Sequence, residues 1–245
     1  MVQNSEIPPG WKLPEEIVLR LGARAGKQRV IAEEGQVLLI LHKPPLKHET
    51  HRESVFFWRN AAGLWDASER GNGLTALNEY LDNYARIEDA LEDDYEKAVS
   101  ARDFFDLLER IAPVQRAVKN MSKALQVARE VAGNELIDYR DKAEELNRNI
   151  ELLYIDSKNA LDYAIAKRAE EQSEMQREAL IAGHRLNIIM ALFLPMTAVA
   201  SLLGMNIPHG LEKSQSWVFI LIVVVCSILG LLMRSLVLKK TKNRP

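Results

Sequence analysis

The sequence predicts an α+β cytoplasmic domain, with a small β-sheet plus helices, followed by a long stalk helix that continues into a two-helix transmembrane region. The fold is mainly α overall, and three observations carry this prediction. Short apolar runs, separated by glycine, proline and polar residues, fill residues 16–66, as in a small sheet. No glycine or proline interrupts residues 135–182. Residues 186–206 and 217–238 carry few charges, and each approaches the roughly 20 residues that a helix needs to cross a bilayer.

Composition limits the class of protein. The 245 residues carry a formal net charge of −2, so binding of nucleic acid through bulk positive charge is not expected. The single cysteine, Cys226, lies in the second apolar stretch, and it can build neither a disulfide framework nor a Cys/His metal cluster. The N-terminus lacks a basic segment followed by an apolar run, so no signal peptide is predicted.

The cytoplasmic domain is expected to occupy residues 1–133. Its sheet, mixed or antiparallel, is predicted from runs rich in apolar and β-branched residues at 17–21, 29–31, 37–41 and 54–58. Residues 46–53 are predicted to form a connecting loop.

Helices are predicted for residues 73–132, one from 73 to about 99 and a second from about 102. Pro113 should kink or break the second helix, because proline lacks the amide proton of a helical hydrogen bond. Gly133 and Asn134 then favour a helix stop and restart.

Residues 134–185 are predicted to form the stalk helix, because they carry a heptad-like apolar seam. Its positions recur every seven residues in two series: Leu136, Ala143, Ile150, Ser157 and Ala164, and Tyr139, Leu146, Leu153 and Ala160. The seam fades after Ile165, where charged residues dominate. One helix from residue 135 to residue 203 would be on the order of 100 Å long at ~1.5 Å per residue.

The second apolar stretch, residues 217–238, begins at Trp217, an expected interfacial anchor. Arg234 lies near its other end, where a long side chain can reach the headgroups. Basic residues flank both stretches on one side, whereas the connecting loop, residues 207–216, holds little charge. The positive-inside rule predicts an integral protein of the inner or plasma membrane, with both termini and the basic tail, residues 239–245, in the cytoplasm.

The first apolar stretch, residues 186–206, contains polar residues that are costly against lipid. Read at helical spacing, one stripe comprises Gly183, Leu186, Met190, Leu194, Thr197 and Ser201. The stripe faces a pore, or it packs the small residues of a span kinked at Pro195 against the second helix. The residues alone leave both readings open.

The segment FLPMTAVASLLGMN, residues 193–206, resembles the CorA family of divalent-cation transporters. The preceding helix, the second stretch and the lysine-bearing tail extend the resemblance. It implies a cytoplasmic α/β domain, a stalk continuing into the first span, a short outer loop and a second span. It also implies a homo-oligomer, a pentamer, in the lipid bilayer, with the first spans lining a pore. The N-terminal part fits only in outline and is shorter than in typical members.

The resemblance implies that Gly204, Met205 and Asn206 form the selectivity entrance of a channel for Mg²⁺, with Co²⁺ and Ni²⁺ as further candidates. Mg²⁺ gives up its water reluctantly, so a ring of Asn206 amide oxygens would bind the hydrated ion. Gly204 can end the helix in a left-handed conformation. The ion is cargo, and no resident cofactor or metal ligand is assigned.

Residues deeper in the first span are expected to line the pore. Thr197 matches a pore-facing family threonine whose hydroxyl contacts the hydrated ion, or it bonds back within its own helix. Leu194 and Leu186 fall where the family places apolar constrictions, which gate by dewetting. Met190 and Ser201 complete the stripe.

The outer loop departs from the usual family sequence, Met-Pro-Glu-Leu. Here residues 207–213 read IPHGLEK, so that Glu212 is displaced and followed by Lys213. His209 would favour a softer metal such as Zn²⁺, although a lone loop histidine is more often solvated. The choice between a Mg²⁺ and a Zn²⁺ transporter, and the direction of transport, therefore stay open.

Two rival functions are weighed against transport. Enzymatic activity is not expected, because the sequence has no phosphate loop and none of the Gly-x-Ser-x-Gly, His-Glu-x-x-His or Cys-x-x-Cys motifs. A non-transporting, membrane-anchored coiled-coil scaffold would leave the polar stripe unexplained. Acidic clusters at residues 88–89, 92–94, 144–145 and 170–171 are interpreted as solvated helix faces, and no metal sensor is assigned.

Overall fold

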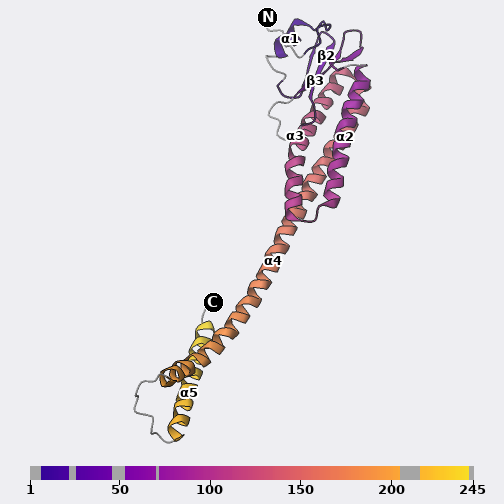
Figure 1. Ribbon diagram of the computed structural model, residues 1–245. Coiled ribbons are helices and arrows are strands. Elements are labelled where there is room, and N and C mark those ends of the chain that lie inside the picture. Colours follow the sequence, from indigo (N-terminus) through magenta and orange to yellow (C-terminus); the bar gives the residue numbers. More distant parts are fainter. Residues whose placement is uncertain (1–6, 22–25, 46–52, 70–71, 205–215, 243–245) are drawn as a thin grey trace. The chain divides into compact units, whose positions relative to one another are not determined.

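The computed structural model describes residues 7–21, 26–45, 53–69, 72–204 and 216–242. They form two compact units, Met1–Ala166 and Lys167–Pro245. The fold is mainly helical with a small four-stranded antiparallel sheet (Figure 1), and the predicted fold class is confirmed. The finer division at residues 133 and 185 stays a prediction.

The sheet is a meander in the order β1-β2-β3-β4. Its strands are β1, Arg29–Glu33; β2, Gln36–His42; β3, Ser54–Arg59; and β4, Trp65–Ala67. Glu34 and Gly35 join β1 to β2 with positive φ angles of 51° and 73°. Two residues of positive φ suit a tight hairpin, because their twist matches that of the flanking strands. The short strand β4 was not among the predicted strands.

Alternate residues of β2 enter two different cores, since successive side chains of a strand point to opposite faces. Leu39 and Leu41 belong to the larger core, which the helices cover. Leu38 and Ile40 belong to a smaller core beneath α1, Glu15–Leu21. Because both faces of the strand are covered, its sequence is an unbroken apolar run and does not alternate with polar residues.

Residues 17–21, predicted to be a strand, belong to α1. Ile17 and Leu21 are buried, whereas Leu19 is 75% exposed. Burial four residues apart is the helical period, and a strand would have buried all three. The prediction was wrong because a five-residue segment with four apolar residues is too short to distinguish the helical period from the strand period.

Two long helices, α2 (Gly73–Lys97) and α3 (Ala101–Ala132), form a hairpin against the sheet (Figure 1). The backbone amide of Asp103 donates to the Ser100 hydroxyl, 3.2 Å away, and the Ser100 amide donates to the Asp103 carboxylate, 2.8 Å away. This capping box starts α3 and lowers the pKa of Asp103 through the same hydrogen bonds. α3 runs through Pro113 without the predicted break.

The helix α4, Ile137–Gly204, follows a short 3-10 turn, η1, at Asn134–Leu136. Its first turns pack into the core of α2 and α3 through the predicted seam, which buries Leu136, Ala143, Leu146, Ile150 and Leu153. Ser157 is also fully buried. Residues 165–183 are exposed on every face, which agrees with a seam that fades after residue 165. The last helix, α5, is Ser216–Lys242.

Hydrogen bonds fix the helices to the sheet at two places. One oxygen of Glu135 accepts from the Arg59 Nε at 2.7 Å and from the Trp65 Nε1 at 3.0 Å. The hydroxyls of Tyr80 and Tyr84 both donate to the backbone oxygen of His42, at 2.5 and 3.0 Å. The ends of the strands are therefore tied to α2 and to the turn that precedes α4.

Candidate functional site

The candidate pore residues lie on the last turns of α4. At 3.6 residues per turn they fall within an arc of about 80°, and Gly204, the last residue of the helix, extends the same face. The side chains of the five are exposed: Leu186, Met190, Leu194, Thr197 and Ser201. This set, called the α4 stripe below, contains hydroxyl and apolar groups and no charge.

The Thr197 hydroxyl donates to the backbone oxygen of Phe193 at 2.9 Å, so the back-bonded arrangement is the one present in the single chain. The hydroxyl oxygen retains lone pairs that can accept hydrogen bonds. Water molecules around a cation present their hydrogens outward, so a back-bonded threonine remains a suitable neighbour for a hydrated cation. Ser227 on α5 makes the same bond to Val223 at 2.8 Å.

α4 continues through Pro195 to Gly204. Proline has no amide proton, so it makes no helical hydrogen bond to the carbonyl four residues earlier, that of Ala191. The helix therefore lacks one backbone bond within the α4 stripe.

The proposed selectivity entrance is only partly described. Gly204 closes α4, and open space surrounds the position where a β-carbon would lie. Met205 and Asn206 lie outside the described residues, as do His209, Glu212 and Lys213 of the outer loop.

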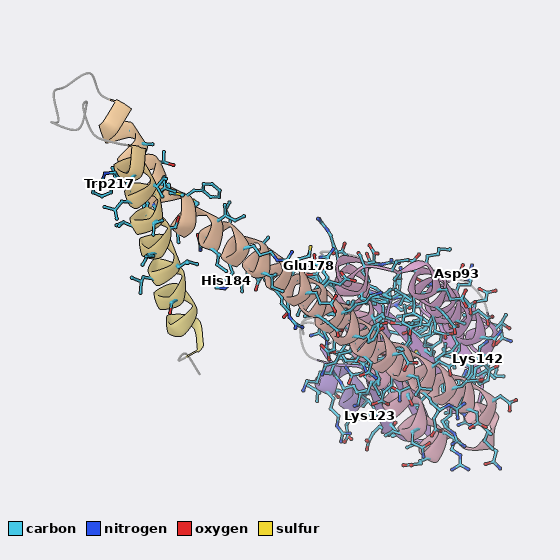
Figure 2. The ribbon with its side chains drawn as sticks, turned by 90° about the horizontal axis from the view of Figure 1, so that it is seen from below. Asp93, Lys123, Lys142, Glu178, His184 and Trp217 are labelled. Atoms are coloured by element: carbon cyan, nitrogen blue, oxygen red, sulfur yellow. The ribbon has the colours of Figure 1, made fainter. Side chains whose placement is uncertain are left out.

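Large apolar side chains are exposed on both helices of the second unit. On α4 they include Leu186, Ile189, Met190, Phe193 and Leu194, and on α5 Ile220, Leu221, Val224, Ile228 and Leu231. Trp217 lies near the start of α5, and Glu178 and His184 lie on α4 just before the apolar stretch that begins at residue 186 (Figure 2). Contiguous exposed apolar surface on this scale indicates contact with lipid or with another protein.

Length and composition point to a membrane for one described helix. Among the described ranges, the helix Asn134–Ser201 is long and apolar enough to cross a bilayer, and Ile220–Leu232 is a shorter apolar helical segment. The second span therefore stays a prediction. No group of three or more His, Cys, Asp or Glu side chains in the described part of the chain is placed to hold a metal ion.

One acidic residue departs from the interpretation of solvated faces. Glu88 is 9% exposed and lies on the buried face of α2. The signal that would have found it is its spacing, four residues after Tyr84 and three before Leu91, both of which are buried. Burial raises its pKa, and repulsion from Asp89, Glu92 and Glu145 adds to the increase.

The model of a protein family described as "CorA-like Mg2+ transporter protein" matches residues 72–240. The match begins at the N-cap of α2 and includes the α4 stripe and all but the last two residues of α5. A comparison with curated proteins gave no match.

Two solved structures are similar to the chain. The structure of the full-length CmaX protein aligns with a TM-score of 0.55 at 15% identity, and the alignment covers 94% of this chain and 83% of that one. The CorA magnesium transporter from Methanocaldococcus jannaschii aligns with a TM-score of 0.43 at 17% identity, covering 91% and 82%. The first alignment shows that the fold is shared over most of both chains.

Proposed function

The chain belongs to the family of CorA-like Mg²⁺ transporter proteins, and on this premise we propose that it is a homo-pentameric channel through which Mg²⁺ crosses a membrane. At the coarser level the chain is a CorA-family divalent-cation transporter and a membrane protein. The family consists of transporters and not of enzymes. The family match over residues 72–240 carries the proposal, because it includes the whole of α4 and all but the last two residues of α5.

The α4 stripe supports a pore. In a ring, each subunit would contribute the same narrow face, and the exposed hydroxyls of Thr197 and Ser201 would accept hydrogen bonds from the waters of a passing ion. Leu194 and Leu186 would form apolar rings that close the pore when water leaves it. Neutral groups suit conduction, because a site must bind the ion weakly enough to release it.

The entrance would be a ring of Asn206 amide oxygens. Stripping water from Mg²⁺ is costly, whereas an amide oxygen can accept a hydrogen bond from the hydration shell without displacing it. Gly204 permits the chain to leave the helix immediately before this ring. Both termini and the first unit would lie in the cytoplasm, because basic residues flank the two spans on that side.

A Zn²⁺ transporter of the same family is the second candidate. It is favoured by His209, because imidazole is a better ligand for Zn²⁺ than for Mg²⁺. Co²⁺ and Ni²⁺ are further candidate cargo ions for the same pore.

Ion flux into proteoliposomes tests the proposal directly. We expect wild-type protein to carry Mg²⁺, and Asn206→Ala to reduce this flux strongly while the protein still assembles into its ring. Asn159→Ala, which removes the same amide from an exposed position in the first unit, is the matched control and should leave the flux nearly unchanged. The flux of Zn²⁺ is measured separately, and the two fluxes show which ion the protein prefers.

The outcomes separate the functions. If the protein carries Zn²⁺ but not Mg²⁺, the transported ion is Zn²⁺. If the flux is the same in Asn206→Ala as in wild type, Asn206 does not form the entrance. An assembled ring that carries neither ion would favour a membrane-anchored scaffold.

The role of Thr197 is tested with a pair of substitutions. Thr197→Ser keeps the hydroxyl and should retain most of the flux, whereas Thr197→Val removes it at nearly the same volume and should lower the flux. Ser227→Ala removes a hydroxyl with the same back-bonded geometry from α5 and is expected to have little effect. Equal losses in Thr197→Val and Ser227→Ala would show that the helix, and not the pore, needs the hydroxyl.

A further inference from the structure

Glu88 lies on the buried face of α2, where the neighbouring positions hold apolar or aromatic residues. The buried face of this helix repeats at four and three residues through Leu77, Leu81, Tyr84, Glu88 and Leu91. Glu88 is the charged member of this series, and its exposure of 9% means that about nine-tenths of the residue is removed from water. The carboxylate oxygens are not fully enclosed, but a carboxylate that loses much of its hydration is still unfavourable unless a partner compensates its charge.

The described part of the chain provides no hydrogen bond or ion pair to the Glu88 carboxylate. Other acids of α2 are paired, because Asp82 contacts the ammonium group of Lys142 on α4, and Asp94 contacts the guanidinium of Arg110 on α3. The charged groups that act on Glu88 are instead Asp89 and Glu92 of its own helix and Glu145 of α4. All three are carboxylates, so the ionised form of Glu88 is repelled by both helices.

We propose that Glu88 makes the packing of α2 against α4 respond to proton concentration. When its carboxyl group binds a proton, the partly desolvated charge and the repulsion across to Glu145 both disappear, and the two helices pack more stably. When the proton leaves, the partly desolvated carboxylate again faces other carboxylates, and the contact loosens. The inference concerns the first unit alone and does not rest on transport.

The direction of the pH dependence follows from linkage. Burial, and secondly the neighbouring carboxylates, raise the pKa of Glu88 in the folded state above its ordinary value. The folded protein therefore binds a proton that the unfolded chain has already lost, and stability decreases as pH rises through the window between the ordinary and the raised pKa. Below the ordinary pKa both states are protonated, and Glu88 adds no further dependence.

This contact lies on the helix that also carries the α4 stripe, since Glu145 and the stripe are both part of α4. Acidification of the compartment that holds the first unit would thus stabilise the packed state of the first part of α4. Proton concentration would therefore regulate the packing of α4 independently of any bound metal.

Hydrogen exchange of the full-length protein in detergent provides the test. The protection of backbone amides in α2 and in the first part of α4 is measured from pH 4.5, the ordinary pKa of a glutamate, to pH 8 and corrected for the intrinsic pH dependence of exchange. In wild type we expect protection to fall several-fold as pH rises. Glu88→Gln keeps the size of the side chain without its charge, and it should give high protection with little dependence on pH.

Two further variants keep the test decisive. Glu96→Gln changes an exposed glutamate of α2 and should reproduce the wild-type pH dependence. Glu145→Gln leaves Glu88 in place but removes the carboxylate opposite, and should weaken the dependence without abolishing it. The proposal is overturned if Glu88→Gln retains the wild-type dependence, or if Glu96→Gln removes it. If Glu88→Gln does not fold, an unchanged dependence in Glu145→Gln overturns it.

Discussion

The two parts of α4 carry similar apolar side chains in opposite surroundings. In the first part, Leu146 and Ile150 are 4% and 1% exposed, within the core that α2 and α3 complete. In the second part, Leu186 and Leu194 are 56% and 67% exposed. The same helix therefore buries its apolar side chains in the first part and exposes the same residue types to the surroundings in the second. The described residues leave these side chains open, as expected for a surface that contacts lipid or other subunits.

Polar groups follow a complementary rule in the two parts. The buried seam of α4 tolerates few of them, and the hydroxyl of Ser157 lies in it without a hydrogen-bond partner among the described residues. In the second unit the hydroxyls of Thr197 and Ser227 bond to their own helices, as hydroxyls in apolar surroundings do. Single substitutions in each part test whether the buried and the exposed residues differ in their effect on stability.

The largest effect is expected in the seam. Leu146→Ala should lower the free energy of unfolding of the first unit by about 2–5 kcal/mol, because it leaves a cavity in a packed core. Leu152→Ala, six residues further on, removes a side chain that is 52% exposed and should change it by less than about 0.5 kcal/mol. Denaturant titration followed by tryptophan fluorescence measures both, and equal losses would contradict the assignment of the seam.

Alanine substitutions at Gly73 and Gly183 should change the stability of the protein in opposite directions. A β-carbon at Gly73 would lie 2.6 Å from the backbone nitrogen of Asp66 and 2.6 Å from the carbonyl carbon of Trp65. Gly73→Ala should therefore destabilise the first unit by about 1–3 kcal/mol through overpacking. At Gly183, within α4, nothing lies within 4 Å, and Gly183→Ala should stabilise the helix by about 0.5–1 kcal/mol. Helical content on heating reports both, and stabilisation by Gly73→Ala would refute the close packing of α2 on β4.

A smaller loss is expected where the sheet is tied to the turn before α4. Glu135→Ala removes the acceptor shared by Arg59 and Trp65. The Glu135 side chain is 33% exposed, so solvent screens the ion pair and the cost should be about 1 kcal/mol. Glu135→Gln, which keeps an acceptor oxygen, should lose less. Calorimetry of the two variants measures the difference, and a larger loss in the glutamine variant would be inconsistent with the shared acceptor.

The smallest effect concerns Ser157, whose buried hydroxyl has no hydrogen-bond partner in the described structure. Ser157→Ala should stabilise the first unit by up to about 1 kcal/mol, because it removes an unsatisfied polar group. Ser227→Ala, which breaks a satisfied bond, should give no such gain. The midpoints of urea unfolding compare them, and a loss of stability in Ser157→Ala would indicate a partner for the hydroxyl.

The sequence was sufficient for the long helices and insufficient for the short elements. The period of Leu136, Leu146 and Leu153 extends over many turns, so it identifies the seam of α4 without other information. Residues 17–21 are too few to distinguish a strand from α1, and β4 contains three residues, which is too short for a periodic signal.

The candidate site was predictable to a different extent. The α4 stripe follows from helical spacing alone, and the structure places its residues on one exposed face. The burial of Glu88 was missed because an acidic cluster ordinarily marks a solvated face. One member of the cluster is turned inward because it falls on the packed face of α2, and the elements that cover this face are far apart in the sequence.

The central claim, that the exposed face of the second part of α4 lines an ion pathway, is tested most directly by thiol modification during Mg²⁺ flux. Cysteine is introduced singly in a Cys226→Ser background, as Leu194→Cys on the stripe and as Val199→Cys, about 140° around the helix. A positively charged, water-soluble thiol reagent should block flux through the Leu194→Cys channel and leave the Val199→Cys channel conducting. Block at Val199→Cys with none at Leu194→Cys would contradict the claim.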